Sequence, residues 1–192
     1  MKINLNKKTV WITSTAVLIA LLIGMQVFTA QFGQFVTGSL VNLILIISVM
    51  TCGPASGLTV AVFSPFFAKL LGIGPLWTIV PFIAIGNVVL VLVWHFLGNM
   101  RFANVHIVRV IALIAAAVCK FLTLYIGVAR ITVPLFLNLP EPQAAAISSI
   151  FALPQLITAS IGGALALVII PVLTRSSTAR PSGIRGQEKD FK

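Results

Sequence analysis

Apolar segments of helical length alternate with short polar, glycine-containing or proline-containing breaks along most of the chain. A bilayer core about 30 Å thick needs about 20 apolar residues per helix, and neighbouring helices can cover a shorter one. The pattern therefore predicts an all-α integral membrane protein with six transmembrane helices in a compact bundle. The apolar segments cover about residues 10–29, 38–50, 58–71, 78–97, 105–128 and 154–174.

The breaks predict where the chain turns. Residues 52–57 and residues 72–75 each contain adjacent glycine and proline, which favour a turn over continued helix. The first outer loop is expected at about residues 30–37. A proline-rich stretch, residues 130–142, follows the fifth segment and predicts a longer loop, after which comes a short alanine-rich helix.

The composition excludes a soluble protein. Of the 192 residues, 59% are hydrophobic and 8% are charged, whereas a soluble domain carries about 25% charged residues. The three acidic residues are too few for paired-carboxylate catalysis or for a cage around a hard cation. His95 and His106 are expected near one end of different helices, with no second ligand at helical spacing. We therefore expect a protein of the cell membrane that has neither enzymatic activity nor a metal site.

The net charge of +10 comes largely from basic residues that flank the membrane segments, and this distribution is not that of a nucleic-acid-binding surface. Arg101 lies in a predicted inner loop, and the predicted outer loops hold only Arg130. The positive-inside rule therefore places both termini in the cytoplasm. We expect a membrane domain over residues 1–174 and a disordered basic tail over residues 175–192. The flanking residues are Lys2, Lys7 and Lys8 at the start and Arg175, Arg180, Arg185, Lys189 and Lys192 at the end.

Lys120 lies well inside the fifth apolar segment, where a charge is costly. A lysine near the bilayer centre costs at least about 2.5 kcal/mol on insertion scales. The alternative is snorkelling, but the outer end of the helix is about 12 Å away at about 1.5 Å per residue, which exceeds the comfortable reach of the side chain. We therefore expect Lys120 to face the bundle interior and to meet a polar partner or a ligand.

Other polar residues gather toward the outer half of the predicted bundle, while the inner halves are almost uniformly apolar. Each of them taken alone is most simply a helix–helix hydrogen bond, worth about 0.6 kcal/mol. Their grouping predicts one outward-facing cavity to which every helix except the third contributes. The candidate substrate-binding residues are Gln26, Gln34, Asn42, Asn87, Lys120, Tyr125, Arg130, Gln155 and Thr158.

The chemistry of the predicted cavity favours some substrates over others. The predicted membrane helices contain no Asp or Glu to pair with a cationic substrate or to relay protons. Lys120 and Arg130 would instead suit a carboxylate, a phosphate or an electron-rich heterocycle. Elsewhere, Trp77 and Trp94 fit an aromatic belt at the membrane surface.

Small residues repeat along one face of the first helix. Ala16, Ala20 and Gly24 follow one another at intervals of four residues, which allows another helix to approach closely. We expect this face to contact a partner protein. Similar small residues in the fifth and sixth segments, among them Ala112, Ala116 and Gly162, are expected to pack the bundle itself.

Several local sequences, together with six short helices and a lysine-rich start, resemble the substrate-binding S components of energy-coupling factor (ECF) vitamin transporters. The resemblance covers about residues 10–174. The sequences that carry it are Thr37-Gly38-Ser39-Leu40-Val41-Asn42, Gly53-Pro54-Ala55-Ser56-Gly57, Ser64-Pro65, Leu71-Gly72-Ile73-Gly74-Pro75 and Leu153-Pro154-Gln155-Leu156-Ile157-Thr158-Ala159, with the Ala16 and Ala20 pair on the first helix.

The resemblance implies a subunit that captures a vitamin or related micronutrient, docks through the Ala16 and Ala20 face onto a membrane-embedded coupling (T) subunit, and topples in the bilayer to release its ligand inward. A pair of cytosolic ATPases would drive the process. ATP would thus be used by the partners, and this chain, which has no Walker A sequence, would bind no cofactor. Gln31, Gln34 and residues 130–143 would act as lids.

Two other functions stay open at the level of sequence. A membrane hydrolase would need a Ser–His pair, a zinc site or paired Asp, and both His residues are expected at the cytoplasmic end. A scaffold or assembly subunit without a small-molecule substrate would use the small-residue faces to recruit partners and the polar groups to lock helix packing.

Overall fold

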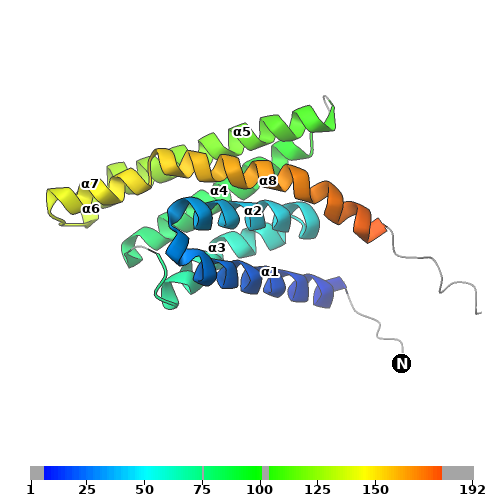
Figure 1. Ribbon diagram of the computed structural model, residues 1–192, viewed down its shortest axis with the longest axis horizontal. Coiled ribbons are helices and arrows are strands. Elements are labelled where there is room, and N and C mark those ends of the chain that lie inside the picture. The colour runs from blue at the N-terminus through cyan, green and yellow to red at the C-terminus, as the bar shows by residue number, and fades with distance from the viewer. Residues whose placement is uncertain (1–6, 75, 101–103, 179–192) are drawn as a thin grey trace, which may run out of the picture.

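The computed structural model describes residues 7–74, 76–100 and 104–178, and these residues form a helical bundle without a strand (Figure 1). The predicted all-α class is therefore confirmed for the described residues. The six longer helices, which match the six apolar segments, are α1 (Lys7–Thr29), α2 (Gln34–Cys52), α3 (Pro54–Leu70), α4 (Val80–Gly98), α5 (Val105–Leu124) and α8 (Leu153–Thr178). The shorter elements are η1 (Ala30–Phe32), η2 (Trp77–Ile79), the π-helix η3 (Tyr125–Thr132), α6 (Val133–Phe136) and α7 (Glu141–Ile150).

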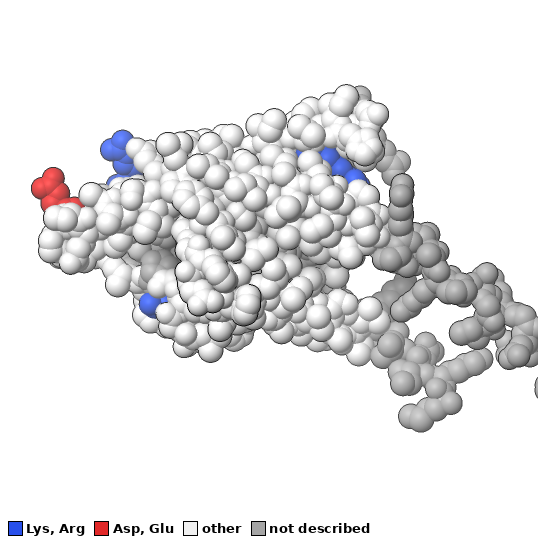
Figure 2. All heavy atoms as spheres, viewed as in Figure 1, with Lys and Arg blue, Asp and Glu red and all other residues white. Residues whose placement is uncertain are grey.

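Five stretches within the described residues are long and apolar enough to cross a membrane. The 17-residue helix α3 is not among them, although it packs against α1, α2 and α4. On the face drawn in Figure 2, charged residues lie toward the two ends of the molecule and the middle is uncharged. The five stretches are Lys8–Phe32, Gln34–Cys52, Trp77–Gly98, Val105–Phe136 and Glu141–Leu173.

The helices run so that the start of α1 and the end of α8 lie at one end of the bundle, while α6 and α7 lie at the opposite end (Figure 1). Lys2, Arg101 and residues 179–192 lie outside the described residues. The helix α8 continues to Thr178, so the first residues assigned to the tail are helical.

Two of the predicted loops are reduced to single glycines. Gly33 (φ 83°, ψ 177°) joins η1 to α2, and Gly53 (φ 87°, ψ 173°) joins α2 to α3. Residues with a Cβ hardly ever adopt this conformation, so a glycine lets the chain reverse within one residue. Pro54 can follow at once, because the first turn of a helix does not use its N–H groups for intrahelical bonds.

The predicted loop over residues 130–142 is wrong for residues 130–136. α5 continues without interruption into the π-helix η3 and then into α6. The Thr132 hydroxyl donates to the Gly127 carbonyl oxygen at 2.6 Å, which supports the wide turn within η3. Pro134 is the second residue of α6.

The main hydrophobic core draws buried residues from all six longer helices and contains Trp94. The sequence placed Trp94 in an interfacial belt, and this is wrong because its side chain is 1% exposed. Gly98 and Gly163 lie beside the ring: a Cβ at Gly98 would be in ordinary contact with the indole nitrogen at 3.4 Å, and one at Gly163 with a ring carbon at 3.5 Å. Trp77 is 53% exposed.

Helix α8 packs closely on α2 at Gly162. A Cβ at Gly162 would lie 2.5 Å from the Ser39 carbonyl oxygen and 2.9 Å from the Leu43 backbone nitrogen. These contacts are with backbone atoms, which cannot rotate away as a side chain can. The small residues of the last helix therefore pack the bundle, as the sequence predicted.

Replacing Gly162 by alanine is expected to destabilise the protein by about 1–3 kcal/mol, because the added methyl group must push α8 away from α2. The thermal midpoint of the purified protein in detergent measures this loss. Gly24→Ala is the matched control, since nothing lies within 4 Å of its added Cβ. Equal midpoints for the two variants would show that the α2–α8 crossing is not tight.

Candidate functional site

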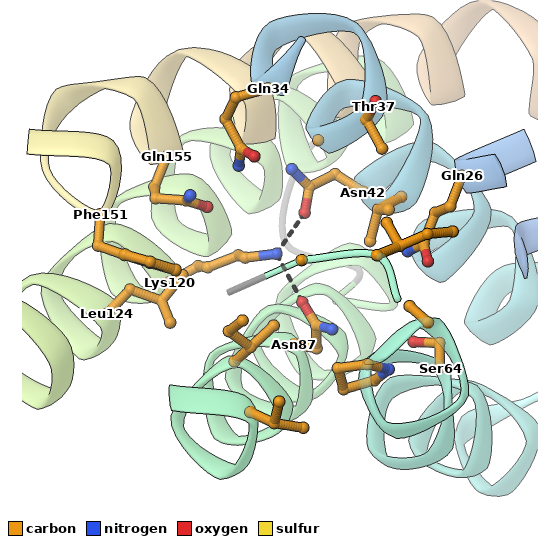
Figure 3. A pocket seen from close by; sticks show the side chains of 18 residues that line it. Gln26, Gln34, Thr37, Asn42, Ser64, Asn87, Lys120, Leu124, Phe151 and Gln155 are labelled. Atoms are coloured by element: carbon orange, nitrogen blue, oxygen red, sulfur yellow. Dashed lines mark hydrogen bonds between the residues drawn. The ribbon is translucent and has the colours of Figure 1, made fainter. Parts of the chain in front are cut away.

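A cavity of about 140 Å³ lies among the six longer helices (Figure 3). Its walls come from the end of α1, the start of α2, the end of α3, the start of α4, the end of α5 and the start of α8. Its polar lining residues are Gln26, Gln34, Thr37, Asn42, Ser64, Asn87, Lys120 and Gln155. Its other lining residues are Gly38, Val41, Pro65, Ala68, Ile73, Gly74, Val80, Ile83, Leu124 and Phe151.

Lys120 is the central polar residue of the cavity. Its side chain is 3% exposed, and its Nζ donates to the Oδ1 atoms of Asn42 and Asn87 at 2.6 Å each. Figure 3 shows the ammonium group held between these two amides, one from α2 and one from α4. The prediction that Lys120 faces the bundle interior and meets polar partners is confirmed.

The hydrogen bonds continue from this lysine toward α8. Asn42 Nδ2 donates to the Thr158 hydroxyl at 3.5 Å, and that hydroxyl donates to the Gln155 carbonyl oxygen at 3.2 Å. Helices α2, α4, α5 and α8 are thus joined by one polar network at the level of Lys120. Because the surroundings are apolar, each of these bonds is stronger than it would be in water.

Two polar atoms at the cavity are buried without a hydrogen-bond partner among the described residues. They are the Gln26 Oε1 atom on α1 and the Ser64 Oγ atom on α3. Gln26 is 8% exposed and Ser64 is 0% exposed. A buried polar group without a partner costs about 1–3 kcal/mol, so such groups in a cavity indicate where a ligand or water binds.

The structure brings together six of the nine candidate residues and separates three. Gln26, Gln34, Asn42, Asn87, Lys120 and Gln155 line the cavity. Thr158 is fully buried behind Asn42. Tyr125 and Arg130 do not line the cavity; Arg130 Nε donates to the Tyr125 hydroxyl at 2.9 Å, and the guanidinium lies 5.2 Å from the ring centre. Arg130 is exposed.

Sequence reasoning missed two polar lining residues, Thr37 and Ser64, and the apolar wall. It assigned no polar residue to the third helix, and this is wrong because Ser64 on α3 lines the cavity. The signal available was the Ser64-Pro65 pair, since a proline inside a helix is unusual and marks a special position. Phe151, which closes the cavity beside Leu124, carries no such signal.

Within the described residues, no group of three or more His, Cys, Asp or Glu is placed to hold a metal ion. His95 lies near the end of α4, where its Nδ1 is 3.3 Å from the Asn99 amide nitrogen. The chemistry that the cavity offers is therefore hydrogen bonding and positive charge, together with apolar contact.

The model of one protein family matches residues 11–174, and its description is "ECF transporter, substrate-specific component". This chain belongs to that family. The match agrees with the resemblance seen in the sequence, which covered about residues 10–174. No curated protein and no solved structure matches the chain.

A substrate-specific component is a subunit of a membrane transporter and not an enzyme. Membership, together with the apolar helices, makes the chain a multi-pass membrane protein that takes part in transport and binds a substrate. In ECF transporters such a component associates with a T component and with ATPases.

Replacing one asparagine is expected to destabilise the protein more than replacing the lysine. Asn87→Leu leaves the buried ammonium with one protein partner and should destabilise the protein by about 3 kcal/mol. Lys120→Met should cost less, because water in the cavity can bind the freed amide oxygens. Adding Lys120→Met to Asn87→Leu should then restore most of the stability that Asn87→Leu alone loses.

Thermal midpoints of the four proteins in detergent give the coupling between the two residues. If the losses of stability of the two single variants simply add in the double variant, the charge is not held by its amide partners.

Proposed function

We propose that the protein captures a vitamin or related micronutrient from outside the cell membrane and delivers it inward with a T subunit and a pair of cytosolic ATPases. The observation that carries the proposal is the cavity, in which a buried lysine and unpartnered polar groups surround a space large enough for a small molecule. ATP would be used by the partner ATPases, and this chain would bind no cofactor.

The proposed topology has six membrane spans, with α3 as the sixth and both termini in the cytoplasm. Antiparallel neighbours support this topology, since the cavity is lined by the ends of α1, α3 and α5 and by the starts of α2, α4 and α8. A cytoplasmic N-terminus would therefore put the cavity in the outer half of the bilayer. The neighbours α1, α2 and α4 can cover the short helix α3.

A scaffold without a substrate is the weaker alternative. A scaffold needs polar groups only where they bond to one another across helices, and the Lys120, Asn42 and Thr158 network would serve that role. It would gain nothing from Gln26 Oε1 and Ser64 Oγ, which are buried beside a cavity without partners. Those two atoms favour a subunit with a ligand.

The proposed docking surface for the T subunit is the small-residue face of α1. Ala16, Ala20 and Gly24 are exposed, and α1 packs against α2 and α3 on its other side. A shallow apolar groove lies beside Ala20 and Gly24, next to Leu40 of α2, and could receive a ridge of side chains from a partner helix. Its lining residues are Ala20, Leu21, Gly24, Met25, Phe28, Thr29 and Leu40.

The purified protein, expressed alone in cells grown on rich medium, is expected to carry a small molecule in about equal amount. Mass spectrometry of the molecules released on denaturation would identify it. Lys120→Ala should remain folded in gel filtration but lose this molecule, whereas a scaffold would lose only stability. A Lys120→Ala protein that keeps its ligand at full occupancy would show that the cavity is not the binding site.

Ala20→Trp is expected to prevent co-purification of the T subunit and ATPases, because the indole would fill the groove. Its bound small molecule should be unchanged, since Ala20 does not line the cavity. Ile114→Trp is the matched control, because Ile114 is 56% exposed on α5, away from this groove. Loss of partners in both variants, or in neither, would contradict the docking surface.

A further inference from the structure

We propose that the ligand of this cavity is a small organic monoanion, with a carboxylate bound to Lys120 and an N–H or O–H donor at its opposite end bound to Gln26 and Ser64. The proposal rests on the function proposed above and specifies the chemical class of the substrate. It is carried by the balance of charge, by the hydrogen-bond donors of the lysine, by the unpartnered polar atoms and by the volume of the cavity.

The charge balance calls for one negative charge. Lys120 is the one charged side chain among the residues that line the cavity, and both of its protein partners are neutral amides. The acidic residue in the described part of the chain, Glu141, is exposed at the start of α7 and does not line the cavity. A buried cation without a counter-ion is costly, so an anion gains affinity by supplying one.

The number of charges selects a carboxylate over a phosphate. A phosphate monoester carries close to two charges at neutral pH and is usually bound by more than one cation or by backbone N–H groups. Arg130, the other candidate cation, is exposed and pairs with Tyr125 outside the cavity. One lysine therefore matches one carboxylate.

The geometry of Lys120 leaves one N–H donor for a bond to the carboxylate. An ammonium group has three N–H donors, and Lys120 directs two of them to Asn42 and Asn87. The two asparagines fix the position of Nζ at the cavity and leave one donor for a ligand oxygen. A charge-assisted bond of this kind is about twice as strong as one between neutral groups.

The end of the ligand opposite the carboxylate must donate hydrogen bonds to a different set of protein atoms. Gln26 Oε1 and Ser64 Oγ can each accept a hydrogen bond, and both lie on the side of the cavity formed by α1 and α3 (Figure 3). A ligand N–H or O–H would supply the missing donor. The rest of the lining is largely apolar and includes Val80, Ile83 and Leu124.

The volume limits the size of the ligand. A cavity of about 150 Å³ in a protein interior is known to hold a benzene molecule. The cavity here is about 140 Å³, so a compound built on a single ring, or a chain of similar size, fits it.

The first test is the charge of the molecule released from the purified protein. We expect it to carry a carboxylate and to migrate as an anion at pH 7. A stoichiometric neutral or cationic molecule would overturn this inference and leave the proposed function intact. Absence of any released molecule would count against the proposed function, and the second test would then decide the ligand class on its own.

The second test uses two probes of one shape, 4-aminobenzoate and 4-aminobenzamide, which differ in the charge of one end. Binding is measured by the rise in the thermal midpoint of the full chain in detergent. We expect the carboxylate to bind about 10-fold to 100-fold more tightly than the amide. Equal binding of the two probes, or binding of neither, would overturn the inference. Benzoate, which lacks the amino group, should bind more weakly than 4-aminobenzoate.

Variants link this preference to the lysine. Lys120→Met should abolish the difference between the two probes, and Lys69→Met, at the end of α3 and outside the cavity lining, should keep it. If Lys120→Met fails to fold, Lys120→Gln serves in its place, because it keeps a polar side chain without the charge. If the preference for 4-aminobenzoate survives in Lys120→Met and disappears in Lys69→Met, the anion binds elsewhere.

Discussion

The arrangement of the bundle depends on how one positive charge is held inside an apolar protein. Lys120 on α5 is 3% exposed, and its two asparagine partners come from α2 and α4. The amide dipoles replace part of the water that the ammonium group would have, but they bring no opposite charge. The network therefore fixes the relative position of three helices and leaves the site with a net positive charge. Under the proposed function, packing and ligand binding would share the same three side chains.

The sequence reveals this network because its members are polar residues in segments that are otherwise apolar. Lys120, Asn42 and Asn87 could be predicted to face inward on that basis, and so could Gln26 and Gln155. Ser64 was missed, since a serine in a membrane helix often bonds to its own backbone, and the only sign of a special position was the proline that follows it. Trp94 was misplaced because its burial depends on packing against residues of other helices, which the local pattern does not show.

The positions of Tyr125 and Arg130 depend on a helix type that the sequence does not announce. Both lie in the π-helix η3, where each turn holds more residues than in an α-helix. A prediction based on α-helical spacing therefore gives the wrong direction for side chains beyond Leu124. The same wide turn carries Gly127 past Phe82, with no space for a larger residue. Local pattern predicts the elements well, and the contacts between distant elements decide which residues meet.

Helix α1 lies between the proposed docking surface and the cavity, and this position has a consequence for the whole transporter. Successive residues of an α-helix are turned by about 100°, so Gly24 and Gln26, two positions apart, point to nearly opposite sides of α1. One faces the proposed docking surface, and the other faces the cavity. Any displacement of α1 by a docked subunit would move a ligand contact with it. By thermodynamic linkage, a ligand that favours one position of α1 would change the affinity for that subunit by the same factor.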